Sequence, residues 1–80
     1  MSVDVQVDAR QIRVRSALDP PSALSWSTTL LQDRRISWKG SVQRGELDRR
    51  VTNLAGSEII TVRMNDGQGT ICTAAVTVPA

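Results

Sequence analysis

The sequence predicts an all-β fold, a small antiparallel β-sandwich of six to seven strands that ends in a C-terminal hairpin. Hydrophobic residues alternate with polar residues in several short segments, as they do in strands that bury one face. Segments rich in Gly, Pro or Asp separate these runs. The 80 residues suffice for one core, so residues 1–80 are expected to form a single β-sandwich domain.

The clearest element is a hairpin that spans Glu58 to Val78. Its apolar residues share one parity in each arm: Ile60, Val62 and Met64 in the first, and Cys72, Ala74, Val76 and Val78 in the second. A loop at Asn65–Gly69 provides glycines for the positive φ angles of a reversal. With that loop, Met64 faces Thr70 and Val62 faces Cys72, whose thiol is expected to pack as a small hydrophobe.

Four alternating runs precede the hairpin, and their apolar positions are expected to face the core: Val3, Val5 and Val7; Ile12 and Val14; Leu24, Trp26, Thr28 and Leu30; Ile36 and Trp38. The two tryptophans are the only aromatic residues, so we expect both to anchor the core. A stiff connection is expected at Leu18–Ser22, because its consecutive prolines cannot lie inside a central strand. A turn is expected at Ala55-Gly56-Ser57.

Residues 42–54 allow two interpretations. The spacing of Leu47, Val51 and Leu54 is helical. The β-branched residues Val51-Thr52 are typical of a strand instead. We favour a strand at Leu47–Thr52, and the helix remains the alternative.

The composition excludes most catalytic sites. There is no His, which excludes Ser-His-Asp and Cys-His pairs and His metal ligands. A single Cys forms neither an internal disulfide nor a Cys-based zinc site. Asn65-Asp66-Gly67 resembles the start of a calcium loop but lacks the spaced oxygens and the closing Glu, which favours a hairpin turn. We therefore expect no enzyme activity, no catalytic or metal-binding residue and no cofactor.

Three large apolar residues fall on the outward parity of their strands and are candidates for a protein interface. They are Leu31, Ile59 and Ile71, with Ala75 beside them. Two hypotheses explain them: a neighbouring subunit or a larger host surface covers them, or residues 42–54 of the same chain do.

The charged residues provide a second candidate surface. The net charge is +2, with nine Arg and one Lys. Arg34-Arg35 and Arg49-Arg50, with Arg44 and Lys39, could form a basic patch for phosphate or an acidic protein surface, because guanidinium groups bind carboxylates and phosphates bidentately. Ordinary solvated loops are the alternative interpretation of the same residues.

Three stretches suggest a family: the Ser25-Trp26 strand, the run from Gly56 to Thr70, and the closing Ala75–Val78 strand. Together they resemble bacterial and phage immunoglobulin-like modules of the polycystic-kidney-disease and bacterial-Ig types. The resemblance covers residues 23–78, without the aromatic residue that these modules often carry in the penultimate strand. It implies an Ig-like sandwich and an adhesive, spacer or surface-decorating role.

We therefore expect a non-enzymatic structural or interaction module. Its most specific form is a phage virion component, such as a capsid-decorating or tail-associated protein that acts in multiple copies, as a homo-oligomer or on a particle. Without a signal peptide or a membrane segment, synthesis in the cytoplasm and a place in the virion are expected.

Two other functions remain open. The alternative is a small cytosolic inhibitor or regulator of a host complex, of the anti-defence type, which the arginines would also suit. Nucleic-acid binding ranks third, because two aromatic residues provide few surfaces on which bases could stack.

Overall fold

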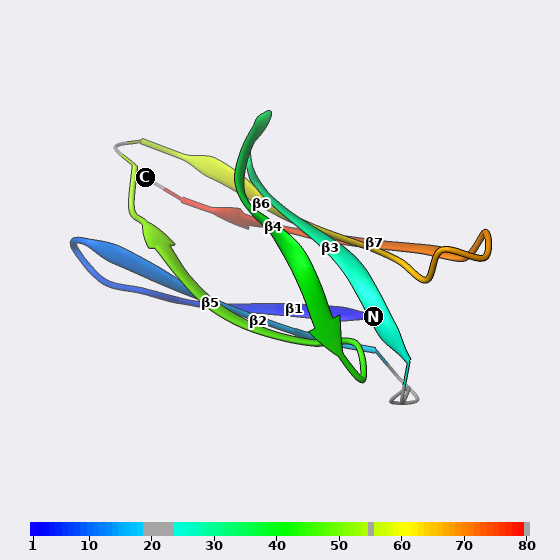
Figure 1. The fold of residues 1–80 in the computed structure, drawn as a ribbon. Helices are drawn as coiled ribbons and strands as arrows, with labels where there is room; N and C mark the ends of the chain where they lie inside the picture. Colours follow the sequence, from blue (N-terminus) through cyan, green and yellow to red (C-terminus); the bar gives the residue numbers. More distant parts are fainter. Residues whose placement is uncertain (19–23, 55, 80) are drawn as a thin grey trace.

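The computed structural model describes residues 1–18, 24–54 and 56–79, and these form two packed antiparallel sheets (Figure 1). The strands are β1 (Ser2–Val7), β2 (Gln11–Ala17), β3 (Ser25–Gln32), β4 (Arg35–Gln43), β5 (Glu46–Thr52), β6 (Glu58–Asn65) and β7 (Ile71–Val78). The predicted small β-sandwich with a C-terminal hairpin is confirmed. The predicted connection through Pro20-Pro21 and the Ala55 position of the predicted turn lie outside the described residues.

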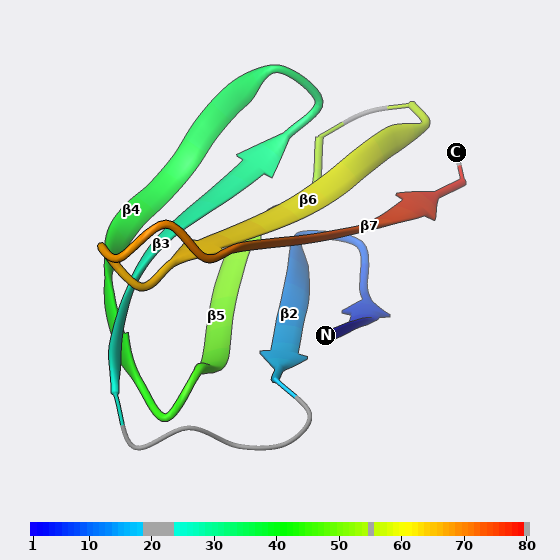
Figure 2. The same cartoon turned by 90° about the vertical axis from the view of Figure 1, so that its right-hand side faces the viewer.

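The strands pair in the order β1-β2-β5 in a three-stranded sheet and β4-β3-β6-β7 in a four-stranded sheet. Figure 2 shows the two layers, with β2 and β5 lying under the four-stranded sheet. The chain therefore changes sheets between β2 and β3, between β4 and β5, and again between β5 and β6. Each sheet has one side facing the core and one outer face, and the outer faces are the surfaces open to partners.

The core consists of the inward residues of both sheets, as the alternation predicts. The buried hydrophobic residues are Ile12, Val14, Leu18, Trp26, Leu30, Val42, Leu47, Val51, Ile60, Val62, Met64 and Val78. Cys72 and Val76 are half-buried and pack against this cluster. Burying these side chains provides the main driving force for folding.

Besides Ile36, which a β-bulge turns outward, three residues expected in the core lie elsewhere. Val7 is exposed because it ends the edge strand β1, where the chain begins to turn. Leu24 is exposed because it precedes the first residue of β3. Trp38 is only half-buried, because it lies on the edge strand β4 with its ring against Gly40. Of the two tryptophans, only Trp26 is a buried core residue.

Residues 42–54 form no helix in their described conformation. β4 continues to Gln43, the chain turns at Arg44-Gly45, and β5 begins one residue before the strand that the sequence favoured. Both turn residues have positive φ, 59° and 69°, as in a type I′ turn. A Cβ at Gly45 would lie 2.3 Å from Cδ1 of Leu18, so only glycine fits where β4 leaves its sheet for β5.

The register of the C-terminal hairpin differs from the predicted one by two residues. Met64 pairs with Cys72 and Val62 with Ala74. The prediction of which hairpin side chains face the core is nevertheless correct, because a shift by two residues keeps each side chain on the same face of the sheet. The shift arises because the loop begins at Asp66, whose Oδ1 accepts hydrogen bonds from the backbone N–H groups of Gln68 (2.7 Å) and Thr70 (3.1 Å).

A β-bulge in β4 changes which face its first residues occupy. Leu30 pairs with Trp38 and Leu31 with Ile36, so Ser37 is an extra residue opposite β3. The Ser37 hydroxyl donates a 2.5 Å hydrogen bond to Oε1 of the buried Gln32. Beyond the bulge Ile36 points outward and is 60% exposed, which corrects its predicted place in the core.

Candidate interaction surfaces

The outer face of the four-stranded sheet carries an apolar patch that no single segment of the sequence contains. The register places Ile36, Leu31, Thr61 and Ala75 in one row across β4, β3, β6 and β7. Ile59 lies in the next row, opposite Thr77. We call Ile36, Leu31, Ile59 and Ala75 the apolar patch.

The apolar patch is open in this structure. Ile36 is 60% and Ile59 47% exposed, Ala75 is also exposed, and Leu31 is half-buried. The hypothesis that residues 42–54 cover these side chains is wrong. Those residues end β4, which lies within the same sheet, and form β5, which belongs to the other sheet.

Ile71 lies apart from the apolar patch, although the sequence grouped it with Leu31 and Ile59. It pairs with Asn65, six residues along β6 from Ile59, which is about 20 Å in an extended strand. The row between Ile71 and the apolar patch carries Lys39, Thr29, Arg63 and Thr73. Ile71 is 49% exposed, so it resembles Ile59 in exposure but not in surroundings.

Hydrogen bonds hold the chain rigidly beneath the apolar patch. Nε2 of Gln32 donates to the backbone oxygen of Thr52 (2.7 Å) and to Oε1 of Glu58 (3.3 Å), which joins the two sheets. Glu58 is 2% exposed, and its Oε2 has no hydrogen-bond partner among the residues described. Asp33 Oδ1 accepts a 2.9 Å bond from the N–H of Ile59. The patch therefore lies on well-fixed strands.

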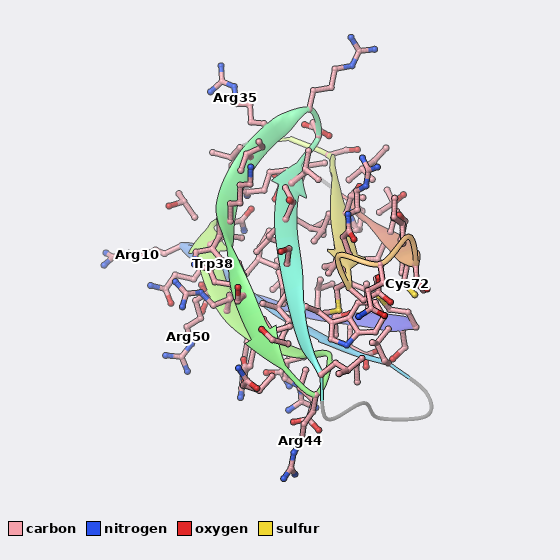
Figure 3. The ribbon with its side chains drawn as sticks, turned by 45° about the vertical axis from the view of Figure 1, so that its right-hand side comes forward. Arg10, Arg35, Trp38, Arg44, Arg50 and Cys72 are labelled. Carbon is pink, nitrogen blue, oxygen red and sulfur yellow. The ribbon has the colours of Figure 1, made fainter. Side chains whose placement is uncertain are left out.

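The predicted basic patch separates into two places. Arg34 and Arg35 lie at the turn between β3 and β4, at one end of the molecule, whereas Arg49 and Arg50 lie within β5. Figure 3 shows Arg35 far from Arg50, with Arg50 and Arg10 extending toward the side on which Trp38 lies. Four arginines that are adjacent in pairs along the sequence therefore do not form one surface.

Arg49 and Arg50 also differ from each other. Arg49 lies between the buried Leu47 and Val51 on the core-facing side of β5, but its side chain is exposed because β5 is an edge strand. Its guanidinium carbon lies 4.6 Å from the centre of the Trp38 ring, a cation–π contact between the two sheets. Arg50 points outward from the three-stranded sheet.

The outer face of the three-stranded sheet is charged. Arg15 lies between Asp4 of β1 and Asp48 of β5. Arg13 donates to both carboxylate oxygens of Asp48, at 2.9 Å from Nε and 2.6 Å from Nη2. This pairing lowers the pKa of Asp48 and raises the pKa of Arg13.

Sequence reasoning missed Arg10 and Arg13 as candidate site residues. The alternation of Arg13 and Arg15 with Ile12 and Val14 was the only signal, and it indicated an outward position without a partner. Arg10 belongs to a turn that Asp8 closes. Oδ1 of Asp8 accepts hydrogen bonds from the backbone N–H groups of Arg10 (2.8 Å) and Gln11 (2.7 Å). These bonds lower the pKa of Asp8, most strongly the one from Gln11.

Among the described residues, no three His, Cys, Asp or Glu side chains gather where they could hold a metal ion. The described part of the chain contains no helix long and apolar enough to cross a membrane. Comparison with protein-family models, with curated proteins and with solved structures finds no match to this chain. The resemblance to immunoglobulin-like modules therefore stays a prediction, and the fold and its two outer faces define the molecule as a small β-sandwich.

Proposed function

We propose that this chain is a non-catalytic binding module that contacts a protein partner through the apolar patch. The observation that supports it is the adjacency of Ile36, Leu31 and Ile59 on one open sheet face. Single exposed hydrophobic residues are common on soluble proteins, but adjoining ones are typical of interaction sites. A rigid sheet face also loses little conformational entropy on binding, which favours association.

The more specific proposal is that the module is a virion component, bound in many copies to a capsid or tail protein. Repeated copies on one particle would make weak apolar contacts sufficient for stable attachment. Sedimentation of the native protein from a lysate of its source tests this setting. Migration with a megadalton particle is expected. Migration as a small free species would contradict the proposal of a virion component. Migration with one host enzyme complex would also contradict it and would favour a regulator of that complex.

The contact surface is tested by substitution. Ile36→Ser with Ile59→Ser should abolish co-migration, because it removes the two most exposed large side chains of the patch. Ile71→Ser is the matched control, since Ile71 has a similar exposed fraction but lies outside the patch. Circular dichroism and urea unfolding should show that both variants fold. Co-migration of the folded double variant would exclude the apolar patch as the contact surface.

A further inference from the structure

Two positive charges oppose each other at the centre of the charged outer face. In the pairing of β2 with β5, Arg13 lies directly opposite Arg50. Like charges in such a pair destabilise a sheet. The next row, by contrast, alternates in sign from Asp4 through Arg15 to Asp48. The Arg13–Arg50 row continues on β1 with the neutral Gln6, so nothing within the row balances it.

The carboxylates nearest to this row are already engaged. Both oxygens of Asp48 accept from Arg13, and Oδ1 of Asp8 accepts from two backbone N–H groups. Arg50 lies in the electrostatic field of both carboxylates. Within residues 1–18, 24–54 and 56–79, however, the one ion pair is Arg13–Asp48. Neither Arg50 nor Arg10 therefore forms an ion pair with a carboxylate in the described part of the chain.

The surface beside Arg13 and Arg50 is hollowed. Two shallow depressions adjoin there, and Arg13 and Arg50 line both. Gln6, Gln11 and the carboxylate of Asp8 also line the first. Arg49 adds a third guanidinium to the second, where Asp48 accepts the hydrogen bonds of Arg13. Figure 3 shows Arg10 and Arg50 extending outward on the same side of the molecule. The depressions therefore present several hydrogen-bond donors in a small area.

We propose that Arg10 and Arg50, which flank the Arg13–Asp48 pair, form a second binding site, the arginine site, which takes an extended acidic segment of a protein partner. A guanidinium binds a carboxylate through two parallel hydrogen bonds. Alternate carboxylates of an extended peptide lie about 7 Å apart, within reach of the long Arg10 and Arg50 side chains. The site lies on the opposite outer face from the apolar patch and does not depend on the function proposed for that patch.

The surroundings favour an acidic peptide over a nucleic acid. Asp4, Glu46 and Asp48 lie on the same outer face and would repel the successive phosphates of a longer polyanion. Proteins that bind single strands also stack bases on aromatic rings. Here Arg49 already covers Trp38, and Trp26 is buried. The positive charge of the arginine site covers only a small area, which suits a peptide segment with two carboxylates.

Titration of the 15N-labelled protein followed by NMR tests the proposal. The probe is an extended peptide with Glu at alternate positions, and the same peptide with Gln measures binding that needs no charge. Shifts are expected at the amides of Arg10, Arg13 and Arg50 with the Glu peptide alone. Arg10→Ala with Arg50→Ala should raise Kd by at least about tenfold, which is the effect of losing even a single charge-assisted hydrogen bond.

The matched control is Arg34→Ala with Arg35→Ala, which removes the same charge at the turn between β3 and β4. Its Kd should stay close to that of the parent chain. An equal loss in both double variants would show unspecific attraction to net charge and overturn the site. Tighter binding of a thymidine oligonucleotide than of the Glu peptide would overturn the choice of ligand, and no shift at millimolar Glu peptide would overturn the proposal as a whole.

Discussion

The two outer faces of the sandwich differ in chemistry, although the two inner faces are alike. On the four-stranded sheet, pairing places Ile36 and Leu31 in one row and Ile59 in the next. On the three-stranded sheet, pairing places Arg13 opposite Arg50. Ile59 comes from a part of the chain distant from Leu31 and Ile36, as Arg50 does relative to Arg13. The comparison teaches that strand register, more than local composition, decides what each face of this molecule offers to a partner.

The strongest test of this comparison separates the inner from the outer side of one strand. Ile60→Ala should lower the free energy of unfolding by about 2–5 kcal/mol, because Ile60 is fully buried and its loss leaves a cavity. Ile59→Ala, one residue away on the exposed side, should change it by no more than about 0.5 kcal/mol. Urea unfolding measures both. Equal losses would mean that the outer face packs within the molecule and is not free for binding.

The second test concerns the corner that brings β5 beneath the four-stranded sheet. Gly45→Ala should destabilise the protein by about 2–4 kcal/mol, through backbone strain at φ +69° and overlap with Leu18. Gly67→Ala is the matched control, with φ +80° but no neighbouring atom within 4 Å, and should cost about 1–2 kcal/mol. Thermal unfolding of both variants compares them. Equal costs would show that the contact with Leu18 does not constrain the corner.

The smallest expected effect is a loss of stability at acid pH that arises from the Arg13–Asp48 pair on the outer face of the three-stranded sheet. Asp48 has a folded-state pKa below its ordinary value, chiefly because it accepts hydrogen bonds from Arg13. Its contribution to stability is therefore complete above the unfolded-state pKa of about 4 and is lost as the pH falls through the lower folded-state value. Arg13 stays charged throughout this range, because the ordinary pKa of a guanidinium lies far above it and the pairing with Asp48 raises it further.

Urea unfolding between pH 6 and about pH 2.5 tests this linkage. Stability should fall below about pH 4 in the parent chain and fall less in Asp48→Asn. Glu46→Gln is the control, because it removes one negative charge from the same face of β5. If Asp48→Asn followed the acid profile of the parent chain, the Arg13–Asp48 pair would have no role in it.

Much of the fold follows from the sequence because period-two alternation is a local signal. The parity of Ile60, Val62 and Met64 correctly indicates which face they bury, and it does so even though the predicted register is two residues off. The loop boundary depended on hydrogen bonds of Asp66, which alternation cannot reveal. The turn at Arg44-Gly45 was missed for a similar reason, since the contact that requires Gly45 comes from Leu18.

The candidate surfaces were harder to predict, because they depend on which strands become neighbours. Leu31 and Ile59 were placed correctly on an outward face, but Ile36 was assigned to the core because the bulge at Ser37 has no signature in the alternation. Arg49 and Arg50 are adjacent in sequence, yet successive residues of a strand point to opposite faces. The opposition of Arg13 and Arg50 required knowledge of the β2–β5 pairing.

The bulge at Ser37 suggests how such a surface could be gained or lost in evolution without a change in composition. The tip between Gln32 and Arg35 is a two-residue turn, and the surplus residue lies inside β4. If the surplus residue moved into the turn, the same side chains would pair in uninterrupted register and Ile36 would point toward the core. The apolar patch would then lose Ile36, its most exposed member, although the composition stayed the same. The length of one turn thus decides whether Ile36 belongs to the apolar patch or to the core.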